Sequence, residues 1–142
     1  MSSRSEKFAT LIESFQGSGL DAHYLGYFEC FNQRRFFEAH EVLEQLWLQQ
    51  RKGPRDLFYK GLIQLAGAFV HLQKGRGGPA MALLRLARAN LAQYPAVYDR
   101  LEVTAVCRHI DDWLHYVEAL DGQALRFCAD QVPKLALLTP AA

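Results

Sequence analysis

The chain has 142 residues, half of them hydrophobic, which suffices for one domain that buries its own core. Its 16 Lys and Arg residues nearly balance 15 Asp and Glu residues, so nothing in the charge predicts binding to nucleic acid or to an anionic membrane. No apolar stretch reaches the roughly 20 residues of a membrane-spanning helix, and the N-terminus lacks the pattern of a signal peptide. Three scattered cysteines are typical of reduced thiols. We therefore expect a cytoplasmic protein.

Apolar residues recur at helical spacing along the whole chain, whereas strand-like alternation is hard to find. Asp21 is a suitable helix N-cap, and Gly53-Pro54 and Gly75 are suitable helix breaks. The pattern predicts an all-α fold, a single multi-helix bundle of about six helices in one domain over residues 1–142. The predicted helices cover residues 5–15, 21–31, 35–50, 55–74, 80–94 and 99–120, with a short further helix over 122–130.

The third predicted helix carries the candidate site. His40 and Glu44 lie four residues apart and therefore share one helix face, which is otherwise apolar. Ionisable groups in an apolar arc are costly unless they are paired, and such pairs are enriched at functional sites. In H-E-x-x-H metalloenzymes, two ligands at this spacing hold zinc while the Glu between them acts as a base. Here Glu44 replaces the second His, and Glu41 is the candidate base that orients water.

A metal site needs a third ligand, and His71 is the candidate. It lies on the one polar stripe of the apolar helix 55–74, together with Lys60 and Gln64. His40, Glu44 and His71 would then hold one divalent ion, such as zinc, iron or manganese. Two alternatives stay open: the same side chains form a satisfied polar network, or they line a small-molecule pocket without metal. Spacing alone favours the network, because a two-residue match is common by chance.

Two other features are weaker candidates. His109, Asp112 and Tyr116 could share one face of the helix 99–120, but they flank its apolar stripe, so we expect a solvated helix edge. The segment 75–78 is rich in glycine but lacks the preceding strand and the Gly-Lys-Ser/Thr ending of a phosphate loop. We expect it to be a turn between helices.

Over about residues 24–94, two separate motifs resemble the bacterial and plant family called domain of unknown function 309. The first runs from Phe31-Asn32 through Phe36-Phe37-Glu38-Ala39-His40-Glu41-Val42-Leu43-Glu44 to Trp47, and the second comprises Gly61-Leu62-Ile63-Gln64-Leu65-Ala66, Ala68, His71, Gly75 and Leu83-Leu84. The resemblance implies a small all-helical domain, sometimes labelled a predicted metal-dependent hydrolase. Its polar signature falls on Glu38, His40, Glu41, Glu44, Gln64 and His71. Arg76 stands where the family pattern has Asn, and the C-terminal helices (residues 99–130) carry no family motif.

Two functions remain open at this stage. If the protein is an enzyme, metal-assisted hydrolysis is the expected reaction, carried by a buried Glu/His/Gln cluster. The alternative is a partner-binding or homo-oligomerising module in which the cluster is structural, because residues 24–47 look like a tetratricopeptide helical hairpin. No second copy is found at the 34-residue period of such repeats. A closed polar pocket would favour the enzyme, and an exposed apolar patch would favour the module.

Overall fold

The computed structural model describes residue 8 and residues 19–120 and 125–139. Within this part the chain forms five α-helices, which confirms the all-α class, and the predicted helix over 5–15 lies outside it apart from Phe8. The elements are α3 (Ala22–Asn32), α4 (Phe36–Gln49), α5 (Asp56–Gln73), α6 (Gly77–Leu91), β1 (Val97–Tyr98), β2 (Leu101–Glu102), α7 (Val103–Ala119) and a 3-10 turn, η1 (Ala129–Gln131).

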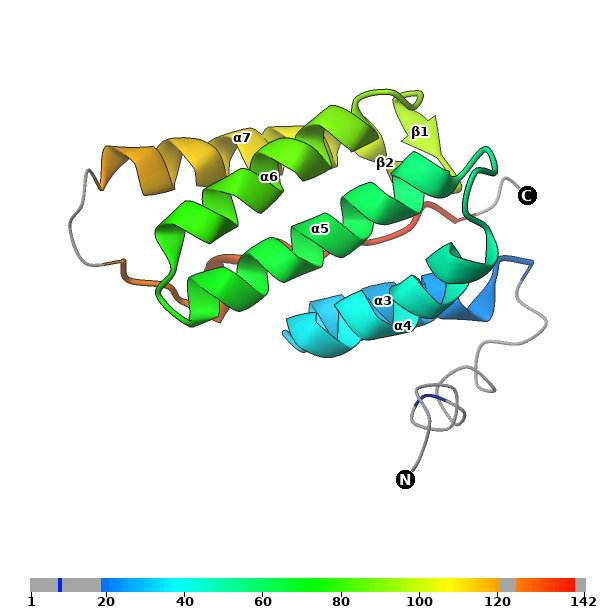
Figure 1. The fold of residues 1–142 in the computed structure, drawn as a ribbon, viewed down its shortest axis with the longest axis horizontal. Helices are drawn as coiled ribbons and strands as arrows, with labels where there is room; N and C mark the ends of the chain where they lie inside the picture. Colours follow the sequence, from blue (N-terminus) through cyan, green and yellow to red (C-terminus); the bar gives the residue numbers. More distant parts are fainter. Residues whose placement is uncertain (1–7, 9–18, 121–124, 140–142) are drawn as a thin grey trace.

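The helices pack mainly against their neighbours in sequence. α5 lies between α4 and α6, while α3 packs on α4 and α7 packs on α6 (Figure 1). Residues 125–139, here called the strap, pass behind α5 and return toward the β1–β2 hairpin. Short connections between sequential helices favour this antiparallel arrangement.

Helix ends follow the predicted signals closely. The Asp21 carboxylate caps α3 by accepting the backbone N–H of His23 at 2.7 Å. Gly75 ends α5 with a φ of +70°, a left-handed conformation that glycine adopts without strain. The N–H of Arg76 then donates to the carbonyl of His71 at 2.9 Å, which closes the end of the helix.

The connection between α4 and α5 is held by Asp56. Its carboxylate accepts the indole N–H of Trp47 at 2.6 Å and the backbone N–H of Lys52 at 3.0 Å. These two bonds hold the pKa of Asp56 below its usual value. The hydroxyl of Tyr94 donates to the carbonyl of Pro54 at 2.8 Å, so the same connection is also tied to the end of α6.

A β-hairpin precedes α7, and the sequence analysis did not predict it. Asp99 and Arg100 have φ values of +46° and +63°, the pattern of a type I′ turn, so the helix predicted from residue 99 begins instead at Val103. Tertiary contacts hold this turn: the Arg55 guanidinium donates to both Asp99 carboxylate oxygens, at 2.7 and 3.2 Å, and the Tyr24 hydroxyl donates to the Asp99 carbonyl at 3.0 Å. Contacts from distant residues are invisible to local periodicity.

The predicted helix over 122–130 is wrong for the residues that the structure describes. Residues 125–128 form no helix, and only the short turn η1 follows them. Leu125 and Phe127 alternate toward the core instead. The Tyr116 hydroxyl donates to the carbonyl of Arg126 at 2.7 Å, so a side chain on α7 takes the place of a helical partner.

The strap is tied to the end of α3. The Asn32 side-chain amide donates to the carbonyl of Leu135 at 2.9 Å, and its oxygen accepts the Leu135 N–H at 2.7 Å. The guanidinium of Arg34, a residue with a φ of +66°, donates to the carbonyl of Val132. Two side chains therefore satisfy main-chain groups that a non-helical segment leaves unpaired.

The core is mainly aromatic at the α3–α4–α5 contact. The hydroxyl of the fully buried Tyr27 donates to the carbonyl of Leu62 at 2.6 Å, and burial raises its pKa well above the usual value. The helices α5 and α6 approach closely at Gly61, where a Cβ would lie 2.9 Å from Leu91 Cγ and 3.3 Å from the Ala87 carbonyl. The aromatic rings that meet in this core include Tyr24, Tyr27, Phe31, Phe36, Phe58 and Phe69.

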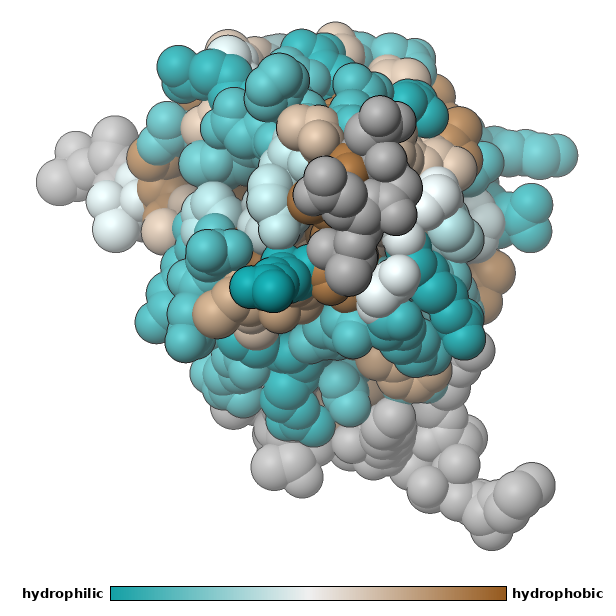
Figure 2. All heavy atoms as spheres, turned by 90° about the vertical axis from the view of Figure 1, so that its left-hand side faces the viewer, coloured by the Kyte–Doolittle hydropathy of each residue, from teal (hydrophilic) through white to brown (hydrophobic). Residues whose placement is uncertain are grey.

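The surface of the described part is mixed in character. None of its helices has the length and hydropathy needed to cross a membrane. The end of the molecule seen in Figure 2 is mostly hydrophilic, with hydrophobic residues in small separate patches. Large exposed apolar side chains are scattered over several elements: Phe37, Leu48, Leu86, Val97 and Leu138.

Candidate functional site

The predicted pair on α4 forms. His40 Nε2 lies 3.4 Å from Glu44 Oε2, and the two side chains are 28% and 22% exposed. The pair is therefore half-buried at the edge of the core rather than within it. The buried face of α4 is centred on Ala39, Val42 and Leu46, so the face that carries His40 and Glu44 is less apolar and less covered than expected.

The exposure of Phe37 and Leu48 shows the same difference. Both lie on the same side of a helical wheel as His40 and Glu44, yet each is about half exposed. Glu41, the candidate base, is instead buried, with 8% of its surface exposed. The α3 and α5 contacts, not the hydrophobic periodicity of α4 alone, decide which face is covered.

The polar residues of the α5 stripe do not share one environment in the structure. Lys60 is exposed and Glu38 on α4 is half-buried, so neither belongs to a closed buried cluster. Gln64 accepts a hydrogen bond from the side-chain amide of Asn90 on α6 at 2.8 Å. His71 lies further along α5 and is half-buried.

Part of the predicted cluster meets at a pocket of about 260 Å³ between α4, α5 and α6. His40, Gln64 and His71 supply its polar lining. Most of its wall is apolar, and Leu83 of α6 was not predicted as a contributor. Neither Glu41 nor Glu44 is among the described side chains that line it. This α4–α6 pocket is lined by Phe37, His40, Ile63, Gln64, Gly67, Val70, His71 and Leu83.

Two polar atoms at this pocket lack partners. The Nδ1 atoms of His40 and His71 are both buried, and neither has a hydrogen-bond partner within the described residues. Buried polar atoms are almost always hydrogen-bonded in folded proteins, because an unmade bond costs about 1–3 kcal/mol. Both atoms belong to side chains that line the α4–α6 pocket.

The donor set does not fit the predicted three-ligand metal centre. No three His, Cys, Asp or Glu side chains in residues 19–120 and 125–139 are grouped so that they could hold one ion. His40 and Glu44 meet each other, and His40 and His71 share the pocket, but the three are not brought together at one point.

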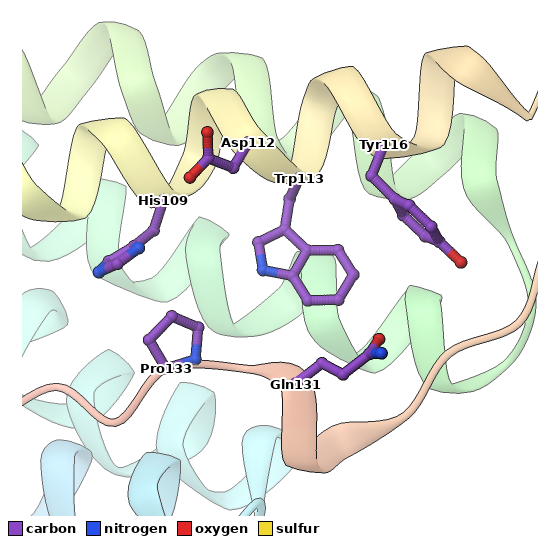
Figure 3. Close-up of a pocket in the computed structure, with 6 residues that line it drawn as sticks. All are labelled: His109, Asp112, Trp113, Tyr116, Gln131 and Pro133. Carbon is purple, nitrogen blue, oxygen red and sulfur yellow. The ribbon is translucent and has the colours of Figure 1, made fainter.

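A second pocket, of about 250 Å³, lies between α7 and the strap. His109, Asp112 and Tyr116, for which a solvated helix edge was expected, line it together with Trp113, and Figure 3 shows the Trp113 and Tyr116 rings directed toward the strap. Asp112 is exposed as expected, but His109 and Tyr116 are half-buried. The strap side of this pocket comes from Gln131 and Pro133. The pocket was not predicted, because the expected helix ended at residue 130 and no structure was expected for Gln131 and Pro133.

Two neighbouring carboxylates on α7 differ in their surroundings. Asp111 accepts two hydrogen bonds from the Arg88 guanidinium on α6, at 2.7 and 3.0 Å, and this contact holds its pKa below the usual value. Asp112 has no ion pair or hydrogen bond with any residue that the structure describes. The carboxylate at the strap pocket is thus available to a ligand.

Comparisons with known proteins support the resemblance found in the sequence. Residues 24–83 match the family described as "Domain of unknown function (DUF309)". The "Uncharacterized protein YpuF" of Bacillus subtilis (strain 168) is 32% identical over 78 residues, which is 54% of this chain and 45% of that protein. The matched region thus spans less than half of this relative's length. No solved structure matches the chain.

Proposed function

We propose that the protein binds a partner protein by receiving one of its aromatic side chains in the α4–α6 pocket. This pocket lies within residues 24–83, the region that matches DUF309. The observation that carries the proposal is a largely apolar pocket in which two buried histidine nitrogens have no partner among the described residues. Aromatic anchors seated in such pockets dominate the binding energy of many protein interfaces.

The size and rim of the pocket favour a side chain over a larger ligand. Its volume of about 260 Å³ is below the roughly 300–1,000 Å³ of typical small-molecule sites. Phe37 stands at its rim with 51% of its surface exposed, where a partner would cover it. An apolar pocket beside an exposed aromatic residue has the composition of an interface centre.

The polar atoms of the pocket select among aromatic anchors. His40 Nε2 lies 3.4 Å from a carboxylate oxygen of Glu44, which can only accept, so a neutral His40 with its proton on Nε2 would present Nδ1 as an acceptor. Its Nδ1 is then an acceptor without a donor. A tyrosine O–H or a tryptophan N–H would supply that donor, whereas phenylalanine has none. The proposed anchor is therefore tyrosine or tryptophan.

The experiment compares two small probes that differ by one hydroxyl group. N-acetyl-tyrosinamide and N-acetyl-phenylalaninamide are titrated into the isotope-labelled chain, and amide shifts of Gly67 and His71 are followed by NMR. We expect the tyrosine probe to bind about three- to tenfold more tightly, the equivalent of one hydrogen bond. Equal affinities, or no shift at this pocket with about 20 mM of either probe, would contradict the proposal.

A matched pair of glycine variants separates binding from folding. A Cβ at Gly67 would lie 3.4 Å from Leu83 Cδ1, an ordinary contact, so Gly67→Ala narrows the pocket without a clash. A Cβ at Gly78 meets nothing within 4 Å, so Gly78→Ala is the control. Gly67→Ala should weaken binding of the tyrosine probe at least about threefold, and Gly78→Ala should leave it unchanged.

Metal-dependent hydrolysis is a second candidate, favoured by the contact of His40 with Glu44 and by the presence of His40 and His71 at one pocket. It is tested by the metal content of tag-free protein beside the His40→Ala variant. About one zinc, iron or manganese ion per chain, lost in the variant, would place this candidate first. No metal in either protein would remove it.

A further inference from the structure

The strap pocket has two aromatic walls set at a right angle. The rings of Trp113 and Tyr116 have centroids 5.6 Å apart and an interplanar angle of 86°. Trp113 also packs against Phe69 and Phe127, which fixes its position. The Tyr116 hydroxyl is held by the Arg126 carbonyl, so this ring is fixed as well. The pocket thus presents a rigid aromatic corner between α7 and the strap (Figure 3).

A carboxylate lies beside this corner. Asp112 precedes Trp113 on α7, lines the same pocket, and has no ion pair or hydrogen bond with the rest of the described chain. The adjacent Asp111 is different, because Arg88 already neutralises it. Lys134 of the strap does not line this pocket but a neighbouring one, which shares His109 with it. Negative charge at the strap pocket is therefore not compensated by lysine or arginine lining it.

We propose that the strap pocket binds a small alkylammonium cation. Aromatic faces attract organic cations through the ring quadrupole, and perpendicular aromatic walls with a nearby carboxylate are the arrangement that suits them. Asp112 supplies the countercharge, Trp113 and Tyr116 supply the faces, and Gln131 and Pro133 of the strap close the opposite side. This cation site shares no lining residue with the α4–α6 pocket, so cation binding does not depend on the function proposed there.

The test uses choline and its uncharged analogue 3,3-dimethylbutan-1-ol, which has the same shape. Each is titrated into the full chain at constant ionic strength, and the indole N–H signal of Trp113 is followed by NMR. We expect choline to bind with a millimolar dissociation constant and the neutral analogue to bind at least about threefold more weakly, as cation–π contacts predict. Equal affinity of the two probes, or no shift of Trp113 with choline, would overturn the proposal.

Variants of the two adjacent aspartates provide the second arm. Asp112→Asn should weaken choline binding about three- to tenfold, because it removes the free countercharge. Asp111→Asn removes the same charge one residue away and should change the affinity less than about twofold. Tyr116→Leu should weaken binding more than Tyr116→Phe, which keeps the ring and loses only its hydrogen bond to Arg126. Both aspartates are exposed, so these variants fold; equal loss in both would refute a specific role for Asp112.

Discussion

The two pockets are similar in size but differ in what builds them. The α4–α6 pocket, of about 260 Å³, is framed by three helices that follow one another in sequence, and every residue that lines it falls within the DUF309 match over 24–83. The strap pocket, of about 250 Å³, joins α7 to a non-helical segment, and every residue that lines it falls outside that match. One pocket thus lies in the part of the chain that matches the family, and the other lies outside that match.

The two pockets are held in shape by different kinds of contact. The frame of the α4–α6 pocket depends on the close contact of α5 with α6, which local helix packing supplies. The strap pocket depends on a few hydrogen bonds between residues about a hundred positions apart. Substitutions should therefore remove one pocket while sparing the other.

Asn32→Ala should have the largest effect and should act on the strap pocket. It leaves the N–H and carbonyl of Leu135 without their partner, at a cost of about 3 kcal/mol in the free energy of unfolding. We expect faster hydrogen exchange in residues 125–139 and weaker choline binding, measured by mass spectrometry and NMR. The tyrosine probe should still bind the α4–α6 pocket. Loss of both choline binding and tyrosine-probe binding would show that the two pockets are not independent.

Gly61→Ala should act on the frame of the α4–α6 pocket. The new Cβ would lie 2.9 Å from Leu91 Cγ and 3.3 Å from a backbone carbonyl, so α5 and α6 must separate. Overpacking of this kind costs about 2 kcal/mol, which urea denaturation would measure. Binding of the tyrosine probe should weaken, while choline binding to the folded fraction should persist. An unchanged midpoint would mean that Leu91 simply moves aside.

Gly67→Ala, on the same helix, should have the opposite effect on stability. Its Cβ makes only an ordinary contact with Leu83, and alanine is favoured over glycine within a helix. The free energy of unfolding should rise by about 0.5–1 kcal/mol even though the α4–α6 pocket is narrowed. A destabilised variant in urea denaturation would indicate that α5 and α6 pack more tightly at this point than the structure shows.

Asp111→Asn should have the smallest effect, and its effect depends on pH. Arg88 lowers the pKa of Asp111 in the folded state. The ion pair therefore stabilises the fold above the usual aspartate pKa, and this stabilisation is lost as the pH falls through the lowered pKa of the folded state. The pair is exposed, so the loss at pH 7 should be below about 1 kcal/mol. Urea denaturation at pH 7 and near pH 3 should show the difference between wild type and variant shrink in acid.

The helical frame was predictable from sequence, and the candidate sites only in part. Hydrophobic spacing and the signals at Asp21 and Gly75 placed four helix boundaries well, because those determinants are local. The burial of individual α4 side chains was not predictable from the sequence, since neighbouring helices decide whether Phe37 and Glu41 are covered. The turn at Asp99 and the strap were missed, because contacts from Arg55 and from distant α3 residues hold them.

The Asn32–Leu135 contact also determines the order in which the two pockets form during synthesis. It joins residues 103 positions apart, so it cannot form until the strap has left the ribosome, whereas α3 to α6 already have their sequential partners by then. A nascent chain can therefore carry the α4–α6 pocket before the strap pocket exists. The strap pocket is therefore present only on chains whose residues 125–139 have left the ribosome.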